Sequence, residues 1–327
     1  MPEAPPGHRP IRPLHLAFAI DARDQHREPH QERYEERYEA SSYIELARLA
    51  ERGALDFVTL DDSPAAADGS AGGLDALAVL AQVAPATDRI GLVAAVTATH
   101  PGTGTVTATH PGAATATHPG TVTVQAALAA LDQVSRGRAG WTPLLPDAWA
   151  ADPEALLRDG WADAAGFPDV ASAGPGPLEG WPVLAVDATS EAPRETAARH
   201  ADVAYVRVGG PHSERLAYEA RTDLRRRAAA YGRDPDRLTV LASLAVELFD
   251  PADAVLLADL FGDWHRDGIT DGFHVRPADP RRDLTRLVNA TVPVLQQRGL
   301  FRRFQPGTTL REHLGLDRPV SRSVTVR

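Results

Sequence analysis

Two neighbouring hydroxyl residues offer the clearest chemistry in this sequence. Thr189 and Ser190 stand directly before a segment of helical character that begins near Glu191. Their hydroxyls and the free N–H groups of the first helical turn could together hold a phosphate group without any lysine. The alternative is that Ser190 only caps the helix. The local pattern fits both a phosphate site and a simple cap.

Other polar residues follow apolar runs elsewhere in the chain, and hydroxyls are the commonest groups among them. They are Asp21, Asp61, Asp62, the Thr97 and Thr99 region, Trp141, Thr142, residues 207–210, His274 and Arg276. No Ser-His-Asp order, paired glutamates or metal-ligand spacing can be picked out from them. The pattern indicates ligand binding and identifies no catalytic residue.

Composition excludes several mechanisms. The chain has 327 residues with no cysteine, and all 34 basic residues are arginine. Disulfide and thiolate chemistry, a lysine Schiff base and a P-loop lysine are therefore ruled out. A net charge of -10 argues against a nucleic-acid-binding protein, whose phosphate contacts need a basic face. The proline-rich N-terminal stretch has no apolar signal core and no run of about eighteen apolar residues occurs, so we expect a cytoplasmic protein.

A short repeat lengthens one connection. The heptapeptide VTATHPG occurs at residues 96–102 and 106–112, and TATHPG follows at 115–120. Removing two copies leaves an ordinary strand-loop-helix connection, so we interpret residues 99–121 as an expanded loop that the fold does not need. His100, His110 and His118 recur with the copies. Their irregular spacing matches no usual ligand pattern, so we expect no metal site.

The elements that must position these residues alternate between strand and helix. Apolar runs predict strands at residues 14–20, 55–60, 89–96, 138–141, 182–186, 203–208, 238–248 and 270–275. Helical patterns lie at residues 38–52, 74–83, 122–134, 191–200, 213–231, 251–267 and 280–298. Eight strands, each followed by a helix or by room for one, predict a single (β/α)8 barrel domain, residues 1–327, with a doubly wound open sheet as the alternative. In a barrel the polar residues that follow the strands would gather at one end.

Several segments resemble one family, in family order along the chain. LDFVTLDDS at 55–63, IGLVAAVTATHP at 90–101 and LDQVSRGRAGW at 131–141 are similar to the flavin-dependent monooxygenases of the bacterial luciferase-like superfamily. The nitrilotriacetate and dibenzothiophene-sulfone monooxygenases form the most similar group. ADLFGDWHRDGITDGFHV at 258–275 and other segments of the C-terminal half agree with it, so the resemblance covers most of the chain.

The resemblance implies a (β/α)8 barrel that uses reduced FMN and oxygen on a small organic substrate. A separate flavin reductase would deliver the FMN, and a homodimer is the expected assembly. By motif, Asp62 matches an acidic residue beside the flavin, and Thr97 or Thr99 matches hydroxyl residues after the third strand. Thr189 and Ser190 match a serine pair that binds the FMN phosphate.

The chain departs from the family pattern in two places. A long segment that carries Asn, His and Tyr beside the flavin has no counterpart after Trp141. Around the phosphate position, Asp187 and Glu191 bring negative charges that would oppose a phosphate unless they point away. Three alternatives follow: an FMN-dependent oxidoreductase with an open site, a degenerate barrel that binds a flavin or a partner without turnover, and a hydride-transfer enzyme that uses a deazaflavin.

Overall fold

Eight parallel strands form a closed barrel in the computed structural model, which describes residues 13–21, 40–61, 75–97, 124–144 and 182–317. The strands pair in chain order, and the pairing of β1 with β8 closes the sheet. They are β1 (His15–Ala19), β2 (Phe57–Asp61), β3 (Gly91–Thr97), β4 (Ala139–Leu144), β5 (Val183–Asp187), β6 (Val203–Val208), β7 (Thr239–Val246) and β8 (Gly272–Pro277). The predicted (β/α)8 barrel is confirmed, and the open sheet is wrong because it would leave two free edges.

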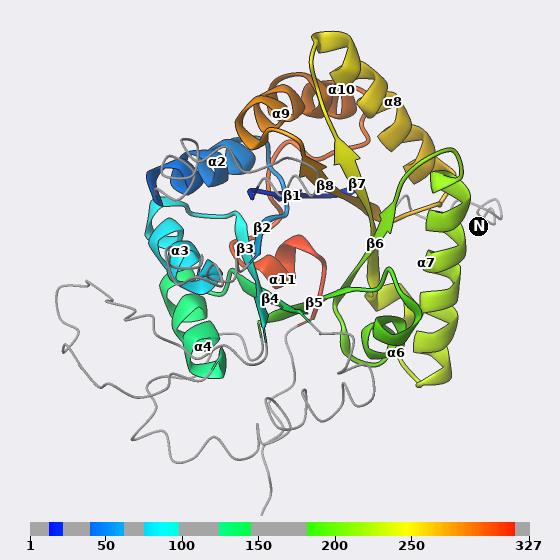
Figure 1. Ribbon diagram of the computed structural model, residues 1–327, viewed down its shortest axis with the longest axis horizontal. Helices are drawn as coiled ribbons and strands as arrows, with labels where there is room; N and C mark the ends of the chain where they lie inside the picture. The colour runs from blue at the N-terminus through cyan, green and yellow to red at the C-terminus, as the bar shows by residue number, and fades with distance from the viewer. Residues whose placement is uncertain (1–12, 22–39, 62–74, 98–123, 145–181, 318–327) are drawn as a thin grey trace, which may run out of the picture.

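Helices surround the barrel, except the last short one, which lies over its centre in Figure 1. They are α2 (Ala40–Arg52), α3 (Ala76–Val83), α4 (Val124–Ser135), α6 (Glu191–His200), α7 (Ser213–Ala230), α8 (Pro251–Arg266), α9 (Pro280–Arg286), α10 (Val292–Gln297) and α11 (Leu310–His313), with short turns at Ala84–Ala86 and Pro235–Arg237. The helix predicted at 280–298 contains a π-helical turn, Leu287–Thr291. Pro293 lies just after that turn and has no N–H with which to continue the regular hydrogen bonding. In the described part of the chain no helix is long and apolar enough to cross a membrane.

Helix α11 closes the amino-terminal end of the barrel. Its Leu310 and Leu314 are buried in one cluster with inward-facing residues of the strands. Gly91 and Gly140 make room for this plug, because an added Cβ would lie 2.6 Å from Leu310 Cδ1 at Gly91 and 3.2 Å from Leu310 Cδ2 at Gly140. Side chains of α11 therefore fill the barrel interior at its amino-terminal end, and any ligand must enter at the carboxyl end of the strands.

At the amino-terminal end of the barrel, three strands are each preceded by an aspartate that accepts a hydrogen bond from the neighbouring strand. Asp56 accepts the N–H of Leu16 at 2.7 Å, Asp202 accepts that of Leu184 at 3.1 Å, and Asp271 accepts that of Val240 at 2.9 Å. In each case the donor belongs to the preceding strand in the barrel. The carboxylates thus supply acceptors at the point where the sheet hydrogen bonds begin.

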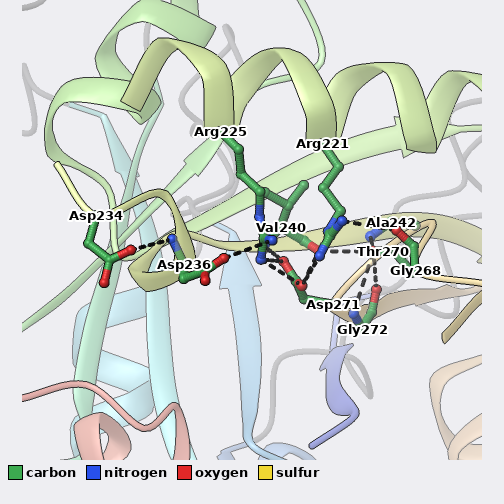
Figure 2. A network of polar contacts seen from close by, with 10 residues as sticks. All are labelled: Arg221, Arg225, Asp234, Asp236, Val240, Ala242, Gly268, Thr270, Asp271 and Gly272. Carbon is green, nitrogen blue, oxygen red and sulfur yellow. Dashed lines mark hydrogen bonds and ion pairs between the residues drawn. The ribbon is translucent and has the colours of Figure 1, made fainter. Parts of the chain in front are cut away.

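Asp271 anchors helix α7 to the barrel (Figure 2). Arg221 and Arg225 are four residues apart on α7, so they share a face, and both donate to Asp271 at 2.9 Å. Burial alone would raise the pKa of Asp271, but the charges of the two guanidinium groups outweigh it and hold the pKa below its usual value. This tie is structural and lies at the end of the barrel away from the polar residues described next.

Arg138 of the LDQVSRGRAGW motif is also structural. Its side chain is buried and donates five hydrogen bonds of 2.7–2.9 Å, to the backbone oxygens of Ser135, Ile90, Ala84 and Thr87 and to the Thr87 hydroxyl. All five N–H groups of a guanidinium are thereby used. Burial lowers the pKa of Arg138 to about 10, so the side chain stays charged at neutral pH. Arg138 thus holds the segment before β3 and the segment before β4 in place by hydrogen bonds.

Candidate functional site

Polar side chains line the inside of the barrel near its carboxyl end. They are Thr59, Thr142, Tyr205, Ser243 and His274, and each is at most 7% exposed. Thr59 on β2 bonds to His274 on β8 although β1 lies between these strands, so both side chains reach into the barrel. Residues two apart on a strand share a face, which places Asp61, Arg207 and Arg276 on the same inner side, closer to the opening. We call these eight residues the barrel mouth.

A chain of hydrogen bonds runs through the mouth. His274 Nε2 lies 3.0 Å from Thr59 Oγ1, His274 Nδ1 lies 3.0 Å from Ser243 Oγ, and Arg276 donates its Nε–H to Ser243 Oγ at 3.1 Å. Burial, followed by the charges of Arg276 and Arg207, lowers the pKa of His274 to about 3. The imidazole is therefore neutral at physiological pH, with one nitrogen donating and the other accepting. It fixes the position of Ser243 and, through it, of Arg276.

Two buried hydroxyls in the mouth have no hydrogen-bond partner apart from each other. They are Tyr205 Oη and Thr142 Oγ1: burial raises the pKa of Tyr205, and the nearby Thr142 hydroxyl opposes that rise. The Tyr205 ring packs between His274, at 4.7 Å between ring centroids, and Phe57, at 6.3 Å. Buried hydroxyls without partners destabilise a fold, and they are common where a ligand supplies the missing partner.

Charged residues surround the opening of the mouth. Arg207 Nε lies 2.8 Å from the carboxylate of Asp187 at the end of β5. Half-buried Arg276 donates to Ser243, and its Nη groups have no hydrogen-bond partner among the described residues. Burial, and then the charge of Arg207, lower the pKa of Arg276, while Asp187 and Asp61 act in the opposite direction. The opening therefore carries a cation that the described residues only partly compensate.

The predicted phosphate residues lie at the edge of this opening, and only one of them is uncommitted. Thr189 donates its backbone N–H and its hydroxyl to Asp187, at 3.1 and 2.6 Å, and accepts the N–H of Arg207 at 2.9 Å. Ser190 is the N-cap of α6 in an extended conformation, but its exposed side chain makes no capping bond. A phosphate therefore fits at Ser190 and the first N–H groups of α6, while Thr189 already has its partners.

Both acidic residues near this position are neutralised by arginines. Glu191 pairs with Arg227 of α7, and that guanidinium also contacts Glu195 at 3.2 Å and Asp223 at 2.9 Å. Asp187 pairs with Arg207. The charge of Glu191 is thus directed towards α7, whereas Asp187 remains beside Thr189 and is the carboxylate that a phosphate would meet.

Three predicted flavin contacts stay predictions. Asp62 and Thr99 lie outside the described residues, as do the histidines of the repeat loop 99–121. Thr97 ends β3, where its backbone pairs with Leu144 of β4. No group of three or more histidine, aspartate or glutamate side chains that could hold a metal ion occurs in the described ranges.

Three of the five buried residues of the mouth escaped the sequence reasoning, whereas Thr142 and His274 were among the polar residues that it singled out. Thr59, Tyr205 and Ser243 sit inside predicted strands and not after them, so a search for polar residues at strand ends passes over them. The available signal was a polar residue within an apolar run, placed two residues before a polar residue at the end of the strand. Residues at this spacing lie on the same face of the strand, so both would face the barrel interior. Tyr205 with Arg207, and His274 with Arg276, both show that two-residue spacing.

Similarity to known proteins agrees with the barrel and its polar end. No protein-family model matches the chain. The nitrilotriacetate monooxygenase component A of Aminobacter aminovorans is 25% identical over 428 residues, which cover 85% of this chain and 90% of that protein. Since 428 positions exceed the 327 residues of the chain, that relative contains segments with no counterpart here.

Two further proteins are similar to the chain, the first in a short stretch of sequence and the second in its fold. The N-acetyl-S-(2-succino)cysteine monooxygenase of Bacillus subtilis (strain 168) is 44% identical over 66 residues, 20% of this chain and 15% of that protein. The solved structure of the EDTA monooxygenase EmoA from Chelativorans sp. BNC1 superposes with a TM-score of 0.72 at 17% identity, covering 94% of this chain and 99% of that chain. The predicted resemblance is confirmed: the chain forms a (β/α)8 barrel, and the proteins similar to it are luciferase-like monooxygenases, among them the nitrilotriacetate monooxygenase component A.

Proposed function

We propose that the protein is a flavin-dependent oxidoreductase of the monooxygenase type, which binds reduced FMN at the barrel mouth and acts on a small organic molecule. Reduced FMN, when bound, supplies two electrons to oxygen, so that one oxygen atom enters the substrate and the other leaves as water. The observation that carries the proposal is the polar interior at the carboxyl end of the barrel, in a chain matched over 85% of its length by a monooxygenase component.

The mouth and the neighbouring start of α6 would have different tasks. Ser190 and the first-turn N–H groups of α6 would hold the phosphate, because they are exposed and have no protein partner. Tyr205, His274 and the other buried residues form the floor against which a flat ring system and a substrate could lie. The neutral His274 and the protonated Tyr205 can each donate a hydrogen bond without adding charge to the floor.

A separate flavin reductase is the partner that this function requires, since the similar protein from Aminobacter aminovorans is named as component A of its monooxygenase. The roles of Asp62 and of Thr97 or Thr99 beside the flavin belong to the same proposal, and so does a homodimeric assembly. FMN is the proposed form of the flavin, and the deazaflavin alternative has no observation of its own to favour it.

Titration of the full chain with FMN, riboflavin and reduced FMN tests the proposal directly. We expect FMN to bind weakly, at micromolar concentration or poorer, and riboflavin to bind more weakly still. In Ser190→Ala the affinity for FMN should fall towards that for riboflavin. NADH-dependent oxygen uptake with an added flavin reductase should then depend on the protein. Absence of heat with FMN up to millimolar concentration, in both redox states, would reject the proposal.

A further inference from the structure

The outer face of helix α8 exposes several large apolar side chains. Phe249, just before the helix, is 61% exposed, and Val255 and Leu256 within it are 40% and 65% exposed. They are three of the seven large apolar residues that are exposed in the described part of the chain. Single residues of this kind are ordinary on a protein surface, whereas a group of them marks a surface that another molecule covers.

The same face of α8 becomes acidic in its second half. At helical spacing, Ala252, Val255 and Leu256 share one side of the helix with Asp259 and Asp263. The two aspartate side chains are 45% and 60% exposed, and each pairs with one exposed arginine. Such surface pairs contribute little to stability, so these carboxylates are free to meet a partner molecule.

Arginines flank the first half of this face. Arg282 and Arg286 of α9 line a groove of about 620 Å³ together with Pro251, the first residue of α8. The Arg282 guanidinium lies 4.6 Å from the centre of the Phe249 ring. Half-buried Arg286 has no hydrogen-bond or ion-pair partner among the described residues. The face is therefore apolar in the middle, with cations beside one end and carboxylates along the other.

A surface with this arrangement is complementary to itself. A two-fold axis through its apolar middle sets the acidic end of one copy against the arginines of the other, and does so twice. We propose that the outer face of α8 pairs with the same face of a second copy of the chain, with the two helices antiparallel and the axis near Leu256. The carboxylates of Asp250 and Asp253, at the arginine end, are turned towards N–H groups at the helix start, which they accept.

This inference gives a surface to the homodimer named under the proposed function, and it rests on that function only for the expectation of a dimer. Association of the full chain is measured without flavin. The failure of one proposal is therefore distinguishable from the failure of the other.

Disulfide cross-linking tests the position of the axis, because the chain has no cysteine of its own. Leu256→Cys should form a covalent dimer when it is oxidised with copper phenanthroline, since a disulfide needs the two Cα atoms to lie about 4–7 Å apart. Leu216→Cys is the matched control, because Leu216 is a leucine of α7 that is also exposed, at 43%. It should stay a single chain on a non-reducing gel. No cross-link through position 256, or equal cross-linking of both variants, overturns the inference.

Sedimentation analysis of the full chain tests the contact itself. We expect dimers of the unchanged chain, at least about tenfold weaker association in Leu256→Asp, and a change within about twofold in Leu216→Asp. Leu256→Asp should keep the circular dichroism spectrum of the folded chain, because the side chain that it replaces is exposed. A dimer that is indifferent to Leu256→Asp is held by another face and overturns the inference.

Charge reversal separates a contact between copies from a role within one copy. Asp263→Arg and Arg286→Asp should each weaken association, and the two together should restore it, because the reversed charges meet again across the axis. Equal weakening in the double variant overturns the antiparallel arrangement.

The remaining outcomes concern the partner. A monomeric chain whose affinity for a flavin reductase falls in Leu256→Asp would assign the face to the reductase and overturn the inference. Dimers through α8 without any flavin binding keep the inference and reject the proposed function; flavin binding by a monomeric chain does the reverse.

Discussion

Asp187 occupies the donors of Thr189 in the turn between β5 and α6, accepting its backbone N–H at 3.1 Å and its hydroxyl at 2.6 Å. These are groups that an anionic ligand at the start of a helix would otherwise use. The chain thus places its own carboxylate where part of a phosphate site would be. The pairing of Asp187 with Arg207 compensates the charge.

Asp187→Ala should therefore strengthen FMN binding. The change releases the N–H and hydroxyl of Thr189, removes a negative charge and leaves Arg207 available. One or two charge-assisted hydrogen bonds correspond to about a tenfold gain in affinity. Riboflavin, which has no phosphate, should bind Asp187→Ala as it binds the unchanged chain. Equal gains for both flavins, measured by fluorescence quenching, would contradict this explanation.

Glu191→Ala is the matched comparison for that experiment. Glu191 lies nearer the helix start in sequence but pairs with Arg227 on α7. Its removal should change FMN affinity by less than about threefold, because its charge is already compensated and partly screened.

Arg138→Met should destabilise the protein by about 3 kcal/mol or more. It removes five donated hydrogen bonds and leaves buried backbone oxygens of three segments without donors. Arg136→Met, two residues earlier in the same turn, is the control. Arg136 is exposed, so its replacement should change the free energy of unfolding by less than about 0.5 kcal/mol in urea titrations. Similar losses in both variants would show that the turn, and not the buried guanidinium, matters.

The sequence predicts the order of the elements well because each strand and helix has its own local pattern. The helix predicted at 191–200 has those bounds in the structure, since a serine at the N-cap position is a local signal. The pairing of Thr59 with His274 could not be predicted, because 215 residues separate them and only barrel closure brings them together. The same holds for Arg138, whose motif carries the family resemblance while its side chain serves the fold.

His274 should make the stability of the protein depend on pH in the weakly acidic range. Its pKa in the folded protein is about 3, below the value near 6.5 of an unfolded histidine, so the unfolded chain binds more protons between these values. Stability is fully present above about pH 6.5 and falls as the pH drops towards 3. His274→Gln should flatten the change in melting temperature between pH 7 and pH 5. The slope will not vanish, because burial also lowers the pKa of His200 and His313. An unchanged slope in His274→Gln would show that the imidazole is not held neutral by the mouth.

Shortening the repeat should have little effect on stability. Residues 99–121 lie outside the described residues, between the end of β3 at Thr97 and the start of α4 at Val124. Deleting residues 103–112 removes one copy of VTATHPG, and loop-closure entropy varies slowly with length, so the free energy of unfolding should change by less than about 1 kcal/mol. A loss of several kcal/mol in urea unfolding would mean that the copies are packed against the barrel.

Oxygen consumption should be uncoupled from substrate oxidation in the isolated chain, because side chains at the rim of the mouth are exposed. The Arg207 and Asp187 side chains are 44% and 33% exposed, and the 428-position match implies segments of the relative that this chain lacks. Productive transfer of oxygen needs water to be excluded from the flavin. With NADH, FMN and a reductase, we therefore expect about one hydrogen peroxide per NADH, as NADH, a proton and oxygen give NAD⁺ and peroxide. The control omits the protein and gives the rate for free flavin. Peroxide well below the NADH consumed, together with a product labelled from ¹⁸O₂, would show instead that the mouth is closed during turnover.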